Sequence, residues 1–270
     1  MISTQLTIPP SSPLAPFVSW ISYYAGDHAH GLERVVPNGS MQLLVNLHED
    51  EFRIYDGADL GTVRTFPGAV VEGASARPSV IDTSQQRELA IVVFRNGGGF
   101  PFFPSLPELG SDDLVDLGEV WGRSGAVLRE QLLETHSVEG KLRALEAALL
   151  AAVRRPLVRD ASVDLALKAF EHGESVAEVT DQLGMTSKRF IRTFTHQIGL
   201  SPKRFSRVRR FQRTLASIPY DRPVDWAELA VARGYYDQSH LIHEFRDLAG
   251  VLPTAYRPRS RGEQNHIPVS

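Results

Sequence analysis

A run of basic residues gives the clearest chemical signal in this sequence. Between Ser187 and Arg213 the chain carries nine Lys or Arg residues and no Asp or Glu, although the whole chain has a formal net charge of -3. Residues 160–262 hold 16 Lys and Arg against 12 Asp and Glu, whereas the rest of the chain holds 13 against 20. A basic part joined to an acidic part predicts that the basic part meets a polyanion.

The basic run lies inside a repeated helical pattern. Gly199 and Pro202 recur 51 residues later as Gly250 and Pro253. The apolar positions before them recur at the same offset, with Phe194 matched by an equivalent phenylalanine. Two copies of one helical unit are therefore predicted, with a basic bridge between them.

Helix boundary signals in each copy have the spacing of a helix–turn–helix. Ser175 and Glu178 can form a capping box at the start of a short helix, and Asp225 and Glu228 repeat the arrangement 50 residues later. In the first copy Gly184 then marks a tight turn before the next helix. A short helix, a turn and a second helix are the elements of this DNA-binding motif.

The second helix of the first unit has two different faces. Phe190, Phe194 and Ile198 share one face, at spacings of four residues, and are expected in the core. The opposite face is expected to read DNA bases, and it consists of Lys188, Ile191, Arg192 and Thr195. An exposed Ile can contact a thymine methyl beside an Arg that reads guanine. An ordinary solvated basic face is the alternative.

The second unit presents an equivalent surface. Its expected base-reading residues are Gln238, Ser239, Ile242 and His243. A long helix between the units is expected to start with Ser201 as its cap and Pro202 in its first turn. Basic residues on this helix and on the two recognition helices are expected to contact phosphates, namely Arg189, Lys203, Arg204, Arg207, Arg210 and Arg246.

The N-terminal part has the pattern of a small β barrel or sandwich. Short apolar runs separated by turn residues predict strands within 41–48, 51–57, 69–74 and 88–94. Residues 1–16 are rich in Pro and Ser and are expected to lie extended over the surface.

Two helices, over about 125–135 and 138–153, are predicted to follow the strands. The second carries a stripe formed by Val138, Leu142, Leu145 and Leu149. This stripe either packs onto the protein's own barrel or mediates self-association. A linker over 154–161 and a disordered tail over 259–270 complete the expected organisation.

The sequence gives little support for an enzyme. The nearest approach to a metal motif is His28, His30 and Glu33, and a solvated loop histidine pair is favoured over a metal site. The chain has no cysteine, and no phosphate loop or nucleophile elbow is present. We expect no cofactor, no membrane span and no signal peptide, and hence a cytoplasmic protein.

Residues 160–258 resemble the DNA-binding domain of the AraC/XylS family of bacterial transcription regulators. The resemblance rests on the first helix–turn–helix, on Gly199-Leu200-Ser201-Pro202, on Gly234-Tyr235, and on Phe245, Gly250, Pro253 and Tyr256-Arg257. The N-terminal part more weakly resembles cupin-like sensor domains of uncharacterised type. The matching segments there are Val36-Pro37-Asn38-Gly39, residues 43–47 and residues 93–98.

The resemblance implies an α+β multidomain protein that is not an enzyme. A cupin-like sensor or dimerisation domain would occupy 1–153, followed by the linker, and a tandem helix–turn–helix domain would occupy 162–258. Its two recognition helices would read successive major grooves of double-stranded DNA. A small-molecule effector, RNA polymerase and a second copy of the chain are the further partners implied. The alternatives are a cupin-type metal enzyme fused to a DNA-binding module, and a regulator whose N-terminal domain binds a protein.

Overall fold

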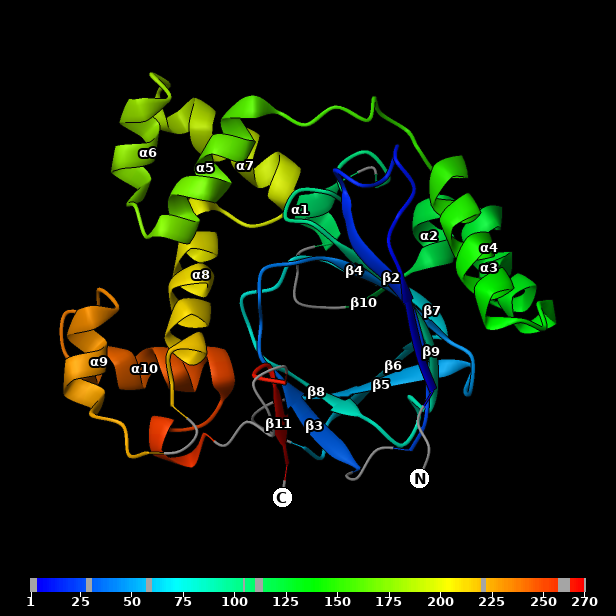
Figure 1. Ribbon diagram of the computed structural model, residues 1–270, viewed down its shortest axis with the longest axis horizontal. Coiled ribbons are helices and arrows are strands. Elements are labelled where there is room, and N and C mark those ends of the chain that lie inside the picture. Colours follow the sequence, from blue (N-terminus) through cyan, green and yellow to red (C-terminus); the bar gives the residue numbers. More distant parts are fainter. Residues whose placement is uncertain are drawn as a thin grey trace.

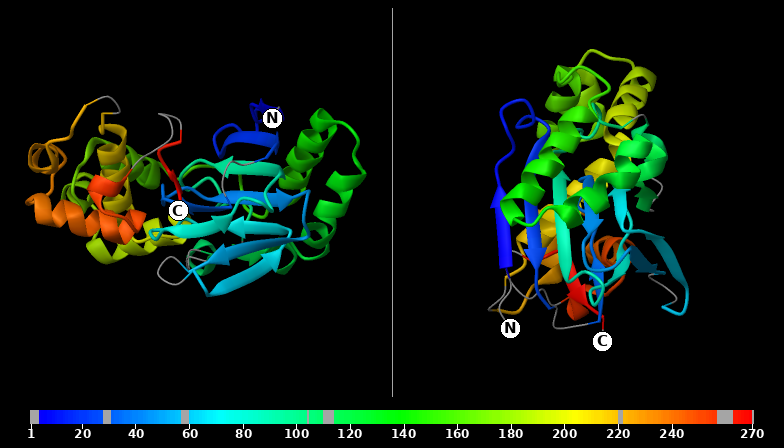
Figure 2. Two further views of the ribbon diagram at one scale, coloured as in Figure 1. Left: turned by 90° about the horizontal axis from the view of Figure 1, so that it is seen from below. Right: turned by 90° about the vertical axis from the view of Figure 1, so that its right-hand side faces the viewer.

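The chain folds into a β-rich N-terminal part and a helical C-terminal part (Figure 1). The computed structural model describes residues 4–27, 31–56, 60–103, 105–109, 114–219, 222–256 and 263–269. Figure 2 shows the helical part against one end of the sheets, away from the green helices of the N-terminal part. The α+β fold predicted from the sequence is confirmed.

Two antiparallel sheets form the N-terminal part. The first contains, in spatial order, β1 (Thr4–Ile8), β2 (Val18–Ala25), β9 (Glu88–Phe94), β4 (Gln42–Asn46), β7 (Ala69–Glu72) and β10 (Leu114–Asp116). The second contains β11 (His266–Pro268), β3 (Leu32–Val35), β8 (Ser79–Asp82), β5 (Glu51–Tyr55) and β6 (Val63–Pro67). The four predicted strand segments correspond to β4, β5, β7 and β9.

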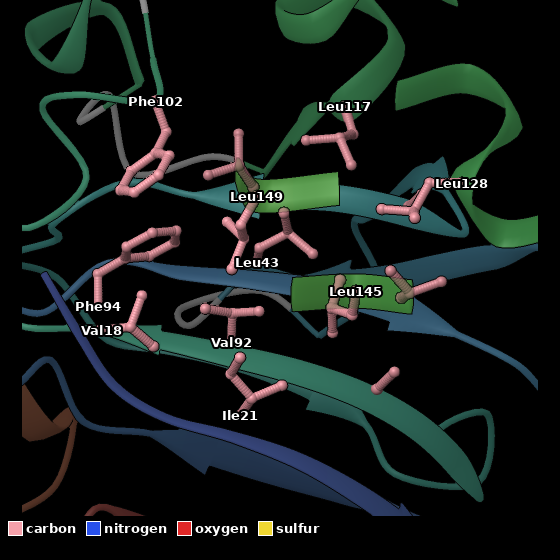
Figure 3. Packing of buried hydrophobic residues seen from close by; sticks show 14 of the residues in the cluster. Val18, Ile21, Leu43, Val92, Phe94, Phe102, Leu117, Leu128, Leu145 and Leu149 are labelled. Carbon is pink, nitrogen blue, oxygen red and sulfur yellow. The ribbon is translucent and has the colours of Figure 1, made fainter. Parts of the chain in front are cut away.

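The two faces of the first sheet have different surroundings, and alternate residues along each strand point to opposite faces. Leu43 and Val92 are fully buried and face the helices, where Figure 3 shows them beside Leu145 and Leu149. Leu44 and Ile91, one position along each strand, point the opposite way into the space between the two sheets. The main apolar core of this part therefore lies between the first sheet and its helices.

Helices cover the outer face of this sheet. They are α2 (Leu117–Trp121), α3 (Arg123–Glu134) and α4 (Val138–Ala151), and the short α1 (Leu106–Leu109) precedes them. Leu142, Leu145 and Leu149 of α4 have no exposed surface because they pack onto the sheet. The stripe on this helix thus packs onto the protein's own sheet, and these side chains are not available for self-association.

The C-terminal part is an array of six helices. They are α5 (Ala161–His172), α6 (Val176–Gln182), α7 (Ser187–Ile198), α8 (Pro202–Ala216), α9 (Trp226–Ala232) and α10 (Gln238–Ala249), followed by the 3-10 turn Pro253–Ala255. Ser175 and Glu178 form the predicted capping box at α6. Gly199 and Gly250 end α7 and α10 in the left-handed region, as their repeated positions predict (φ 89° and 63°).

Both chain ends pair with strands in ways that the sequence did not predict. Thr4–Ile8 is extended at the surface, as expected, and also pairs as β1 with β2 along the sheet edge. The prediction of a disordered tail is wrong for His266–Pro268, which pair as β11 with β3, while residues 259–262 lie outside the described residues. The physical reason is burial, since Ile267 enters the core around α8 and α10. The sequence offered only a three-residue strand, too short for a pattern to be recognised.

Residues 152–160 connect α4 to α5 and are fixed to the N-terminal part. Arg154 N donates to Pro101 O at 2.9 Å, and the guanidinium of Arg155 lies 4.5 Å from the centre of the Phe100 ring. Arg159 donates to Asn96 O at 2.9 Å and forms an ion pair with Asp164 at the start of α5. The predicted linker is therefore held in place by contacts at both ends.

Candidate functional site

The outward face of α7 has the exposure expected of a recognition helix. Phe190 and Phe194 are buried, while Lys188, Ile191 and Arg192 are exposed. Ile191 leaves 45% of its surface in solvent, so the apolar group predicted beside the basic residues is available for contact. These three side chains lie in the first half of the helix, which is the half that reads base edges in helix–turn–helix complexes.

Thr195, the fourth residue predicted on this face, is less exposed than the other three. It is half-buried, and its hydroxyl Oγ1 has no exposed surface and no hydrogen-bond partner among the described residues. The second half of α7 packs against α1, and the His196 and Phe100 rings lie 5.1 Å apart, edge to face. Because the N-terminal part covers this end of α7, Thr195 is not available to a DNA base in this arrangement.

The equivalent helix α10 presents a less basic face. Gln238, Ser239 and His243 are exposed, and Ile242 is half-buried. Asp237 caps the helix by accepting from His240 N at 2.8 Å. The polar face expected from the repeat is therefore present in both units.

Cations that could contact phosphates remain exposed near both recognition helices. Arg189 and Arg246 lie on α7 and α10, and Lys203 and Arg204 lie in the first turn of α8. Ser201 caps α8 by accepting from Arg204 N at 3.4 Å. The positive end of the α8 dipole and these side chains favour an anion at the same place.

Two residues predicted to contact phosphates are engaged inside the protein. Arg207 pairs with Glu244 at 3.0 Å and with Asp247 at 2.6 Å. Arg210 also pairs with Glu244, and its guanidinium stacks 4.5 Å from the centre of the Tyr235 ring. Only 3% of the Glu244 side chain is exposed, so this carboxylate depends on the two arginines for charge compensation. We call these three residues the α8–α10 clamp.

Two further arginines of the basic run join α8 to other parts of the protein. Arg209 pairs with Glu171 at the end of α5 at 2.7 Å and donates to Asn38 O at 3.2 Å. Arg213 donates to Phe170 O at 2.5 Å. Part of the positive charge that marked this run therefore orients α8 and does not face DNA.

Residues 37–39 and Asn265 of the β-rich part, which we call the sheet rim, contact α8 directly. Gln212 of α8 donates to Pro37 O and to the side chain of Asn265, both at 2.8 Å. Gly39 has φ 78°, and a β-carbon added there would lie 3.2 Å from the Phe205 ring. A larger residue at position 39 would therefore strain the backbone and crowd α8.

A cavity of about 460 Å³ lies between the two sheets. Its apolar lining includes Trp20, Leu44, Phe52 and Ile91, and its polar lining includes Gln42 and Glu72. Residues 36–40, Asn265 and His266 also line it, and several of them contact α8. This volume lies within the range of about 300–1,000 Å³ typical of small-molecule sites.

The metal motif considered from the sequence lies only partly within the described residues. His28 and His30 lie outside the described residues. Glu33 lies on β3, almost fully buried, where its carboxylate contacts His266 Nδ1 at 3.0 Å. In the part of the chain that the structure describes, no group of three or more His, Asp or Glu side chains is placed to hold a metal ion.

Two helix–turn–helix units joined by one helix, each with an exposed polar face, define a DNA-binding protein by class. Residues 179–259 match the family described as "Helix-turn-helix domain", and residues 6–111 match the family described as "Domain of unknown function (DUF6597)". The C-terminal part of the chain is therefore similar to helix–turn–helix domains, and the coarse function that this match supports is that of a DNA-binding transcription regulator.

Solved structures of ToxT from Vibrio cholerae are similar to this chain at a low level. One is 9% identical and has a TM-score of 0.43, covering 95% of this chain and 98% of that chain. A second, with unsaturated fatty acid bound, is 8% identical and has a TM-score of 0.39, covering 94% of each chain. No curated protein matches the sequence. None of the helices in the described part of the chain is long and apolar enough to cross a membrane.

Sequence reasoning missed the residues that join the two parts. Asn38 and Gly39 were noted only as part of a resemblance, and Gln212 was not singled out. One signal was present in the sequence. The Gly97–Gly99 run permits a close approach of chains, and a β-carbon on Gly97 would lie 2.9 Å from Ile198 of α7.

Proposed function

We propose that this regulator reads DNA in a sequence-specific manner by placing α7 and α10 in successive major grooves. The observation that carries the proposal is that the two helices, at the two ends of α8 (Figure 1), both expose polar faces at equivalent positions. Base edges would be contacted by Lys188, Ile191 and Arg192 from α7 and by Gln238, Ser239, Ile242 and His243 from α10. Arg189, Lys203, Arg204 and Arg246 would contact phosphates.

We further propose that the β-rich part senses a small molecule in the cytoplasm. The cavity between the sheets supports this role over the binding of a protein partner, because a protein-binding domain has no need for an interior space of about 460 Å³. We also propose that the protein forms a homodimer and contacts RNA polymerase, as the resemblance to AraC/XylS regulators implies.

The test is an in vitro selection of random DNA duplexes with the full-length protein. The expected result is a bipartite motif whose two conserved clusters lie about 10 bp apart, one helical turn of B-DNA. Arg192→Ala should alter one cluster and His243→Ala the other. Enrichment of one cluster only would remove α10 from base reading, and binding without enrichment of any motif would refute sequence-specific reading.

A further inference from the structure

The cavity between the sheets has an acidic lining. Glu33 and Glu72 are its acidic residues, and His266 is the only basic residue among the described residues that line it. His266 already contacts Glu33. No Lys or Arg lines the described part of this cavity, so Glu72 has no cationic partner of its own there.

A row of four paired side chains crosses the cavity face of the first sheet from Trp20 to Glu72, and Glu72 in turn pairs with Leu114 of β10. Trp20 of β2 pairs with Val93 of β9, Val93 pairs with Gln42 of β4, and Gln42 pairs with Glu72 of β7. All four side chains line the cavity. Three strand spacings separate the two ends of the row, or about 14 Å. The row offers an aromatic ring at one end, one apolar side chain and one amide in the middle, and a carboxyl group at the other end.

The environment of Glu72 disfavours an isolated negative charge. Burial raises the pKa of its carboxyl, and the hydrogen bond from Gln42 and the nearby His266 offset only part of this effect. The carboxylate would be stabilised by a cation that enters the cavity, because a buried charge is compensated best by an opposite charge within hydrogen-bond distance.

We propose that this cavity binds a small molecule with an apolar body and a protonated nitrogen head, such as an amine or amidine. The head pairs with Glu72, and the body lies along Val93 toward Trp20, whose ring face also attracts cations. The regulatory role of this ligand rests on the proposed sensor function. Binding of the ligand to the cavity does not require DNA and can be measured in its absence.

An anionic ligand does not fit this lining. A buried carboxylate or phosphate would lie near Glu33 and Glu72 with no Lys or Arg among the described lining residues to compensate it. Transfer of an uncompensated charge from water into such a site is strongly unfavourable. The charge of the lining therefore selects against fatty acids and other anions and favours cations.

The same cavity reaches the helix that carries both DNA-binding units. Residues 37–40 and Asn265 line it, and Pro37 O and Asn265 Oδ1 accept from Gln212 of α8. The neighbouring His266 holds the C-terminal strand to Glu33. A cation bound at Glu72 would lie near His266 and would therefore repel its protonated form, which would loosen this strand and the support of α8.

The test uses matched pairs of probes with the full-length protein. Three ammonium compounds with phenethyl, 2-(naphthalen-1-yl)ethyl and decyl bodies are compared with carboxylates of the same bodies by calorimetry and thermal shift at pH 7.5. At least one ammonium probe should bind and raise the melting temperature, and its carboxylate counterpart should not. Glu72→Gln, which keeps the shape and the contact with Gln42, should weaken binding by about tenfold to a hundredfold, as expected for loss of a charge-assisted hydrogen bond.

Two control variants separate the effect of the Glu72 charge from a general loss of charge and from a loss of space in the cavity. Glu49→Gln removes a carboxylate outside the cavity and should leave affinity unchanged, whereas Ile91→Phe fills the cavity and should weaken binding without a change of charge. Equal or tighter binding of the carboxylates, binding unaffected by Glu72→Gln, or no binding of any ammonium probe would overturn the proposal. A failed DNA selection would refute the proposed regulator function and leave this result untouched.

Discussion

The α8–α10 clamp leads to a prediction for Arg210 that is opposite to the phosphate contact expected from its position in the sequence. A basic side chain on the helix between two DNA-binding units is expected to contact phosphate. In the structure Arg210 pairs instead with the buried Glu244 and stacks on Tyr235. We therefore expect Arg210→Ala to reduce the stability of the protein and to leave the salt dependence of DNA binding unchanged.

The magnitude follows from the burial of Glu244. Its side chain is 3% exposed, and removal of Arg210 leaves Arg207 as its partner within the clamp. Loss of one hydrogen bond to a charged group costs about 1.5–3 kcal/mol, and the lost contact with Tyr235 adds about 0.5–1 kcal/mol. Because Arg207 still compensates part of the charge, we expect the free energy of unfolding to fall by about 2–3 kcal/mol, below the range for a fully uncompensated ion.

The assay is a urea titration followed by circular dichroism, paired with fluorescence anisotropy on a selected duplex at several salt concentrations. Lys203→Ala is the matched control, because Lys203 is exposed on the same helix. It should leave stability within about 0.5 kcal/mol and reduce the salt slope by about one. An Arg210→Ala protein with normal stability and a reduced salt slope would refute the clamp and restore the phosphate role.

Three further predictions concern other parts of the chain. Arg192→Ala should weaken binding to the selected duplex by about 1–3 kcal/mol and relax one base position; an equal loss on all duplexes in the same anisotropy assay would make Arg192 a phosphate contact. Deletion of residues 263–270 exposes β3 and removes the buried Ile267, and should lower the free energy of unfolding by at least about 2 kcal/mol; an unchanged urea midpoint would contradict this. Burial raises the pKa of the Glu72 carboxyl above its ordinary value of 4.5 in the folded state. The free energy of unfolding therefore falls as the pH rises from this ordinary pKa to the raised pKa, because the folded protein holds the proton over this range while the unfolded chain releases it. Glu72→Gln should therefore be more stable than the wild type at pH 8 and similar at pH 4 in urea titrations, and parallel pH profiles would contradict the assignment.

Local signals explain why so much of the helical part could be predicted from the sequence. Caps such as Ser175 and Ser201, and stop signals such as Gly199, act within one helical turn, so their effect is readable from neighbouring residues. The buried stripe of α8, which includes Phe205 and Phe211, follows the helical period and was equally readable.

Side-chain partners far apart in the sequence could not be predicted in the same way. Exposure of Arg207 and Arg210 was inferred from their type and helical position. Their pairing with Glu244 depends on how α10 crosses α8, which no local pattern specifies. For the same reason Thr195 fell on the predicted base-reading face, although α1 and its neighbours cover that end of α7.

The contact of the sheet rim with α8 suggests how ligand binding in the cavity would alter the position of the two DNA-binding helices. A ligand in the cavity would lie beside residues 37–40 and Asn265, which hold α8 through Gln212 and Arg209. Because α8 joins both helix–turn–helix units, its displacement would change the placement of α7 and α10 together. Two recognition helices must match the turn of one DNA duplex, so a small shift of their shared helix would affect affinity more than an equal shift of either helix alone.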